Sequence, residues 1–352
     1  MAKKNKNEKP ALSYSEAERR LREGEPGRLY LLLGPEEYLR EYFLGELKKK
    51  CLPEGEDDFS FRRLNGPELD PNELRSAVDA MPFLSERSFV EVRGAEFNKL
   101  KEADRILAVL EDIPEFCTVA FVQNAQFEPD GRSKLVKAMR ERGEDVSFTQ
   151  QSQDKLIRWI VRRFAAANKH IELEAAQRLI FISGDLMNRL IPEIDKISAY
   201  AKGQTVTVQD VETVANHIPE AVVFDLSDAM AGRKFNTAFS ILSELLADKN
   251  NEPIFLLSLL GTQMRGLYAA KLADERQLGV KGVMDLGAAR YDFQARRLLT
   301  ASRGFTREQL INAVRICAET DYRIKSSGGS DRELLKEALL RIAAGEEKRE
   351  AD

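Results

Sequence analysis

The stretch from Arg28 to Lys50 is the part of the sequence whose pattern could support nucleotide chemistry. A buried strand over Leu29–Leu33 precedes Gly34, and apolar residues then recur every four residues in a predicted helix. A loop that binds a triphosphate at such a junction needs several glycines, a lysine for the β- and γ-phosphates and a Ser or Thr for Mg²⁺. None of these stands in the turn after Gly34, where Glu36 and Glu37 occupy the helix N-terminus and would repel a triphosphate. We therefore expect a strand, turn and helix without a phosphate site.

The strands that would carry the remaining groups of a nucleotide hydrolase also lack them. The predicted strand from Thr118 ends in the uncharged Gln123 and Asn124, and the acid of the strand Ser88–Val92 is Glu91, inside the strand rather than at its end. A hydrolase needs an acid at such an end to hold Mg²⁺ and a polar group to orient water. The two histidines have no acid, base or metal partner at a diagnostic spacing, and no GxSxG pattern occurs. The sequence predicts no catalytic, cofactor-binding or metal-binding residues.

Composition and cysteine use exclude several classes of protein. The chain has 352 residues, of which 43% are hydrophobic and 32% charged, as is typical of a soluble globular protein with two or three domains. No apolar run approaches the ~20 residues of a membrane span, and the opening MAKKNKNEKP lacks the apolar core of a signal peptide. We therefore expect a cytoplasmic protein. The three cysteines form no CxxC pair, which argues against a zinc site and predicts small buried hydrophobes.

Charge is distributed unevenly along the chain, whose formal net charge is −4. Residues 24–150 carry 18 Lys and Arg against 26 Asp and Glu, whereas residues 265–325 carry 12 against 7. The second window permits contacts with phosphate groups. A solvated helix face often has a similar excess, so the window does not require them.

Hydrophobic patterning predicts a parallel α/β domain followed by helices. Five apolar segments alternate with helical sequence, the pattern of an open parallel sheet covered by helices on both faces. These strands are predicted at Leu29–Leu33, Phe59–Leu64, Ser88–Val92, Thr118–Gln123 and Val146–Thr149. The strand signals stop after Gln151, and two helical regions follow. We expect a flexible basic tail and leading helix over 1–23, an α/β domain over 24–150, helical domains over 151–219 and 220–345, and a charged tail over 346–352.

The helix predicted over Leu69–Met81 has clear start and stop signals. Asp70 is the expected N-cap and is followed by a proline in the first turn, while Leu74, Val78 and Met81 form an apolar stripe directed inward. A proline at position 82 makes continuing the helix costly. The Phe-Leu pair that follows comes after the core stripe is complete. It is a candidate for an exposed apolar tip, although the residues alone favour the alternative that the pair covers the end of the helix against the sheet.

Five runs of sequence, in order along the chain, resemble the delta subunit family of bacterial DNA polymerase III. They are LYLLLGPEEYLREYF, AMPFLSERSFVEVRGAE, SGDLMNRLIPEIDKISAYA, VFDLSDAMAGRKFNTAFSILSEL and ETDYRIKSSGGSDRELLKEALLRIA. The resemblance implies an AAA+-like architecture, in which a RecA-like α/β domain is followed by a helical lid and a helical collar. It also implies a chain that neither binds nor hydrolyses ATP, in agreement with the turn at Gly34. The clamp-loader motor subunits differ because they keep the phosphate-loop lysine.

The resemblance also implies partners and a binding site. Members of the family bind the beta sliding clamp and open it, within a heteropentamer that contains the motor subunits gamma or tau and the delta-prime subunit. Their hydrophobic wedge for the clamp falls in AMPFLSER, which here assigns Met81, Pro82, Phe83 and Leu84 to clamp binding. The chain would thus be part of the DNA polymerase III holoenzyme, a nucleotidyltransferase complex, without catalytic residues or cofactors of its own.

Primed DNA within the assembled loader is a further expected partner. Arg296 and Arg297, beside Phe293, lie in the basic window and are candidates for contacting it. Adjacent residues on a helix point about 100° apart, so one of the two arginines at most is expected to face a phosphate squarely.

Two alternatives from other functional classes stay open at this stage. One is a divergent AAA+ ATPase with an atypical phosphate loop, which nucleotide binding would reveal. The other is a DNA-binding regulator, although the sequence has no turn-linked helix pair with a cluster of base-reading side chains.

Overall fold

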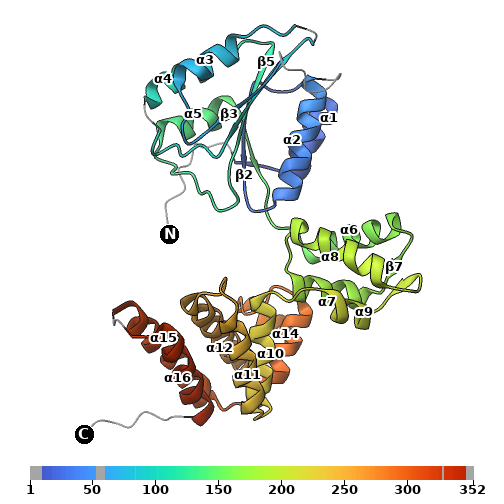
Figure 1. Cartoon of the computed structure of the whole chain (residues 1–352), viewed down its shortest axis with the longest axis vertical. Coiled ribbons are helices and arrows are strands. Elements are labelled where there is room, and N and C mark those ends of the chain that lie inside the picture. The colour runs from blue at the N-terminus through green and yellow to red at the C-terminus, as the bar shows by residue number, and fades with distance from the viewer. Residues whose placement is uncertain (1–9, 53–59, 84, 101, 327–328, 346–352) are drawn as a thin grey trace. The chain divides into compact units, whose positions relative to one another are not determined.

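The computed structural model describes residues 10–52, 60–83, 85–100, 102–326 and 329–345. It divides into two compact units (Figure 1). The first, here called the α/β unit, comprises Met1–Ser152 together with Asp185–Ile191, and the second, the helical unit, comprises Gln153–Gly184 and Pro192–Asp352. The further division of the helical part into domains over 151–219 and 220–345 stays a prediction.

The α/β unit is built on a parallel sheet with the strand order β1-β6-β2-β5-β4-β3. The strands are β1 (Leu12–Ser13), β2 (Leu29–Leu33), β3 (Phe61–Asn65), β4 (Ser88–Arg93), β5 (Cys117–Val122) and β6 (Glu144–Ser147). The predicted fold class is confirmed, with one correction. The sheet has six strands rather than five, because the two residues of β1 are too few to produce an alternating pattern. Phe59, the predicted start of the second strand, lies outside the described residues.

Helices cover both faces of this sheet, as the unbroken apolar strands predicted. Helices α1 and α2 pack together on one face, and α3, α4 and α5 lie on the other (Figure 1). Their bounds are α1 (Tyr14–Glu23), α2 (Glu37–Cys51), α3 (Pro71–Asp79), α4 (Ala103–Glu111) and α5 (Lys134–Arg142). All five residues of β2 are buried, which explains why the sequence of that strand is apolar at every position.

The helical unit contains one small strand pair that the sequence analysis missed. Strand β7 (His170–Ile171) pairs in parallel with β8 (Thr205–Val206), and each has only two residues. The helices are α6 (Gln153–Ala166), α7 (Leu173–Ser183), α8 (Met187–Tyr200), α9 (Val208–Val214), α10 (Pro219–Ala231), α11 (Phe235–Ala247), α12 (Pro253–Glu275), α13 (Gly279–Asp285), α14 (Asp292–Ser302), α15 (Arg307–Ser326) and α16 (Asp331–Ala344). Helix α8 belongs to both units, since its first five residues are counted with the α/β unit.

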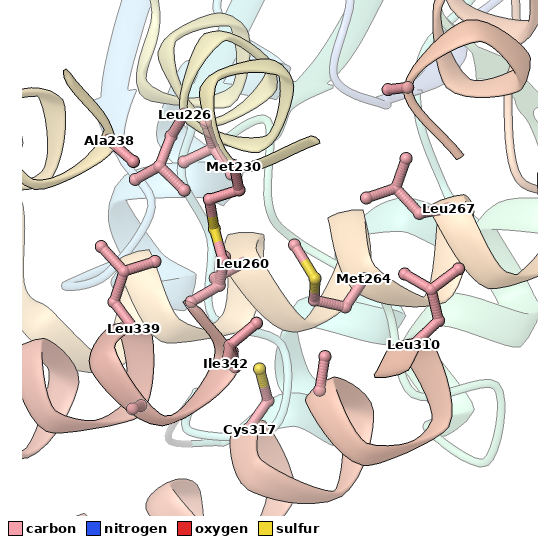
Figure 2. Close-up of a cluster of buried hydrophobic side chains, with 14 of the residues drawn as sticks. Leu226, Met230, Ala238, Leu260, Met264, Leu267, Leu310, Cys317, Leu339 and Ile342 are labelled. Carbon is pink, nitrogen blue, oxygen red and sulfur yellow. The ribbon is translucent and has the colours of Figure 1, made fainter. Parts of the chain in front are cut away.

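Helix α12 is the centre of the larger core of the helical unit. It packs against α10, α14, α15 and α16, and Figure 2 shows Leu260 and Met264 of α12 among side chains from these neighbours, including Met230, Cys317 and Ile342. The apolar residues of α12 and its neighbours therefore pack in the hydrophobic core of the helical unit itself. The three cysteines are buried and free, as predicted. Among the described residues, no helix is both long enough and apolar enough to cross a membrane.

Candidate functional site

The helix that precedes the predicted binding tip starts as the sequence indicated. A carboxylate oxygen of Asp70 accepts a hydrogen bond from the backbone N–H of Asn72 at 3.1 Å, which caps the helix, and Pro71 occupies its first turn. Leu74 and Val78 are fully buried against the sheet. Helix α3 is therefore capped at its N-terminus and packed against the sheet through its apolar face.

The end of α3 corrects one prediction. Met81 was expected to belong to the inward stripe, but the residue is 77% exposed. The helix ends at Asp79, two residues earlier than predicted, because the ring of Pro82 would clash with the helical carbonyl of Val78 and disfavours a helical conformation at Met81. Once the chain leaves the helix, the spacing from Val78 no longer directs Met81 to the core.

An exposed apolar tip follows α3. Phe83 is 74% exposed, and with Met81 it presents two large apolar side chains within three residues. Leu84 lies outside the described residues. Pro82 between them is half-buried, and the exposed Glu86 follows. We call Met81–Phe83 the α3 tip.

The backbone around the α3 tip is held by hydrogen bonds. The N–H of Phe83 donates to the hydroxyl of the buried Ser60 at 3.4 Å, and Ser60 also accepts at its carbonyl from the N–H of Phe89 at 2.8 Å. Arg87 donates to the carbonyl of Pro26 at 3.2 Å, and the hydroxyl of Ser85 donates to the carbonyl of Arg87 at 2.7 Å. The tip is therefore an anchored turn whose apolar side chains face solvent. Its role in binding stays a prediction.

The turn at Gly34 packs closely against the end of β6. Gly34 has a φ of +116°, and a Cβ atom there would lie 2.5 Å from the carbonyl oxygen of Phe148. The same carbonyl accepts from the N–H of Glu36 at 3.0 Å, and Arg40 donates to the carbonyl of Gly34 at 2.8 Å. Glycine is thus required at position 34 by the close approach of two backbone segments.

The acidic residues at the start of α2 bind the first turn of α8. The carboxylate of the buried Glu36 accepts from the N–H of Met187 at 3.2 Å, and the carboxylate of Glu37 accepts from the side-chain amide of Asn188 at 3.0 Å. A carboxylate at a helix N-terminus is favoured by the helix dipole. Sequence analysis placed these acids correctly at the start of α2 but missed their partners on α8.

The buried Glu36 leads to a prediction about pH. Burial, and to a lesser degree the neighbouring Asp185, raises the pKa of Glu36 from 4.5 to about 7, despite the hydrogen bond from Met187. The folded chain then binds the proton more tightly than the unfolded chain, so stability falls as pH rises from about 4.5 to 7. We expect Glu36→Gln, which keeps an acceptor for Met187, to stabilise the protein by as much as about 3 kcal/mol at pH 8.

Thermal unfolding at pH 5 and pH 8 measures this effect. The gain from Glu36→Gln should be large at pH 8 and small at pH 5, where the wild-type carboxyl is already protonated. The matched control is Glu37→Gln on the exposed neighbour, which should change stability little at either pH. A gain that is equal at the two pH values would contradict the prediction.

Three basic side chains surround the carboxylate of Glu91, the acidic residue of β4. Its fully buried carboxylate lies 2.6 Å from the ammonium of Lys48 and accepts from Arg63 at 3.0 Å and from Arg93. Burial alone would raise the pKa of Glu91, but the hydrogen bonds from Lys48 and Arg93 hold it below its usual range. Arg93, the last residue of β4, also forms two bonds with Glu41, at 2.9 and 2.7 Å. In the described part of the chain, no cluster of three or more His, Cys, Asp or Glu could hold a metal ion.

The three candidates for DNA contact lie on α14 in different surroundings. The Arg296 side chain is 71% exposed and forms an ion pair with Asp292 at 3.8 Å. The Arg297 side chain is 22% exposed and is bound by Asp225 and Asp228 of α10, the latter at 2.7 Å. Because its guanidinium already has two carboxylate partners, Arg297 fits a structural role better than a phosphate contact.

Phe293 lies in the aromatic cluster that surrounds Arg297. Its ring meets that of Phe181 edge-on with centroids 5.4 Å apart, and the guanidinium of Arg297 lies 5.1 Å from the same Phe181 ring. It also stacks against Tyr291 at 5.8 Å. Sequence analysis missed the acidic partners, although two aspartates three residues apart on one helix could have indicated a site for an arginine.

Comparisons with known proteins agree with this architecture. Residues 220–342 match the model of the family described as DNA polymerase III delta subunit, C-terminal domain. The chain is 25% identical to the DNA polymerase III subunit delta of Bacillus subtilis over 329 residues, covering 91% of this chain and 94% of the relative. It is 23% identical to the probable DNA polymerase III subunit delta of Aquifex aeolicus over 298 residues, covering 82% and 83%.

A solved structure supports the same fold. The Bacillus subtilis DNA clamp loader delta protein superposes with a TM-score of 0.51 at 20% identity, covering 94% of this chain and 99% of that one. The family model and the two relatives thus confirm the resemblance found in the sequence, and the solved structure shares the fold: this chain is similar to the delta subunits of bacterial DNA polymerase III.

Proposed function

We propose that this chain is a non-catalytic clamp-loader subunit, which binds the beta sliding clamp and opens the ring for loading onto primed DNA. The observation that carries the proposal is the α3 tip, where two large apolar side chains are exposed on an anchored turn. Exposed apolar groups in such a position are typical of a surface that a partner covers. The similarity to DNA polymerase III delta subunits and to a solved DNA clamp loader delta protein supports the choice of the sliding clamp as that partner.

The packing of α3 against the core supports a mechanism by which the tip could open the clamp ring. Leu74 and Val78 pack into the core, so the α3 tip is presented on a helix that is anchored rather than on a free loop. A rigid apolar tip that fits a distorted clamp surface better than the relaxed one shifts the closed ring toward the open state. In this proposal residues 24–150 carry the tip, 151–219 form the lid, and 220–345 form the collar that assembles with the motor subunits and delta-prime.

Binding to the sliding clamp in the absence of DNA and nucleotide tests the proposal. The complete chain, mixed with purified beta clamp from the same organism, should give saturable heat in a calorimetric titration. A DNA-binding regulator would bind duplex DNA but not the clamp, and a divergent ATPase would bind ATP. Failure of the complete chain to bind the clamp, alone or assembled with motor subunits, would contradict the proposal.

Arg296 is the residue of α14 that we propose to lie near primed DNA. We expect Arg296→Glu to weaken DNA-dependent clamp loading and to lower the dependence of binding on log salt concentration by about 0.9, the value for one lost phosphate contact. Lys249→Glu, the same charge change at an exposed position of the same unit, is the control. An unchanged salt dependence in Arg296→Glu would count against the contact. Arg297 is left out of the test because a carboxylate there would lie beside Asp225 and Asp228.

A further inference from the structure

A cleft of about 510 Å³ opens in the helical unit where α14 is joined to α15. Four basic side chains line it, each from a different part of the unit: Arg233 after α10, Lys271 on α12, Arg303 after α14, and Arg307 at the start of α15. We call it the α15 cleft. Convergence of four cations from separate elements on one open cleft creates a positive potential that attracts anions.

The backbone of the α15 cleft is fixed by packing. A Cβ atom on Gly304 would lie 2.4 Å from the carbonyl oxygen of Ala231, so the connection from α14 crosses the end of α10 in direct contact. The ring of Phe305 packs against the core of the unit. Arg303 is oriented by an ion pair with Asp274 at 3.2 Å. The basic side chains of the α15 cleft therefore stand on a backbone that is held in place by its packing.

The start of α15 adds backbone donors to these cations. The hydroxyl of Thr306 accepts from the N–H of Gln309 at 3.1 Å, and the amide oxygen of Gln309 accepts from the N–H of Thr306 at 2.9 Å. This reciprocal cap uses the N–H of Gln309, whereas the N–H groups of Arg307 and Glu308 belong to the first turn, which has no intrahelical acceptors. Both residues line the cleft, at the positive end of a helix of 20 residues.

Two carboxylates restrict the kind of anion that suits the α15 cleft. Glu275 and Glu308 also line it, and they would repel a compact ligand that concentrates several charges at one point. A chain of singly charged phosphates fits better, because successive phosphates can meet separate cations along an open surface.

We propose that the α15 cleft binds the phosphodiester backbone of DNA without reading its sequence. The choice of DNA as the source of the phosphates rests on the proposed clamp-loader function. The contact is distinct from that proposed for Arg296 on α14, since it uses side chains of the α10–α11 connection, α12, the α14–α15 connection and the start of α15.

Fluorescence anisotropy with a labelled primer–template duplex tests the site in the complete chain. We expect the double variant Lys271→Glu with Arg307→Glu to bind at least about tenfold more weakly at low salt, and to lose about 1.8 from the salt slope, the value for two phosphate contacts. Because Arg307 also interacts with Tyr268 and with Glu275, thermal unfolding of the double variant checks that its loss of affinity does not reflect unfolding. The neutral pair Lys271→Gln with Arg307→Gln should give an intermediate loss.

The matched control makes the same charge change elsewhere on the helical unit. Lys249→Glu with Arg332→Glu alters two exposed residues, the second of which also lies in the first turn of a helix, and should leave the affinity within about twofold. Equal losses in the control and cleft variants would overturn the site, as would an unchanged affinity in the cleft variant. A cleft variant that binds DNA normally but no longer assembles with the motor subunits would assign the cleft to a protein contact instead.

Clamp binding separates this proposal from the proposed function. The cleft variant should bind the sliding clamp as the wild type does, because its substitutions lie outside the α3 tip. If the wild type fails to bind the clamp, the proposed function fails. If it binds the clamp and the cleft variant keeps its full affinity for DNA, only the DNA site fails.

Discussion

Replacing Phe83 and Leu84 together by alanine is expected to weaken binding to the sliding clamp by two orders of magnitude or more. Burial of each side chain in a partner pocket would contribute ~1.5–3 kcal/mol, and ~2.7 kcal/mol corresponds to a hundredfold change in affinity. Because Phe83 is largely exposed in the isolated chain, its truncation removes few contacts within the fold. The variant should therefore lose clamp binding and loading while its thermal stability stays nearly unchanged.

Calorimetric titration of the variant with the clamp, together with thermal unfolding, measures both parts of this prediction. Leu173→Ala, which shortens an exposed leucine of the helical unit, is the control for a general loss of apolar surface and should bind the clamp normally. Met81→Ala is expected to give a smaller loss than the pair, because one apolar side chain is removed instead of two. Normal clamp binding by the double variant would show that the tip is not the contact, and unfolding would show that the pair is part of the core.

Sequence patterns predicted the parts of the fold that depend on neighbours along the chain. The strand Leu29–Leu33 has the predicted bounds, since a strand covered on both faces is apolar at every position. The cap at Asp70 was likewise predicted, because its partner is two residues away. Met81 was misplaced by the same reasoning. Spacing from Val78 directed it inward, but the effect of Pro82 on the preceding residues ended the helix first.

Contacts between residues far apart in the sequence were not predictable from such patterns. Glu36 and Met187 are separated by 151 positions, so the hydrogen bond that joins them left no local signal. The partners of Arg297 are also distant in the sequence and could not be predicted from local patterns. Its position in a basic window suggested a phosphate contact, while its partners Asp225 and Asp228 lie about 70 residues earlier and cancel its charge. Charge counts over a window cannot distinguish an arginine that faces solvent from one that is paired within the fold.

Replacing Glu91 by leucine is expected to lower the free energy of unfolding of the α/β unit by about 3–5 kcal/mol, the usual cost of removing one partner from a buried ion pair. The three cations around this carboxylate differ in what they can do once it is gone. The side chains of Arg63 and Arg93 are partly exposed and can turn to water. Lys48 is nearly buried, over the ring of Phe61, so its ammonium would lose the carboxylate 2.6 Å away at a place that water reaches little.

A second substitution distinguishes the effect of burying the Lys48 charge beside an apolar residue from the loss of packing at Glu91. In the double variant Lys48→Met with Glu91→Leu, the buried pair is replaced by apolar groups of similar length, and most of the lost stability should return. Urea unfolding followed by circular dichroism measures each variant. The control is Glu46→Ala on the same helix as Lys48, which removes an exposed pair with Lys49 and should cost less than about 1 kcal/mol. If the double variant is as unstable as Glu91→Leu alone, the stability comes from the hydrogen bonds between Glu91 and the two arginines, and the assignment of the loss to Lys48 is wrong.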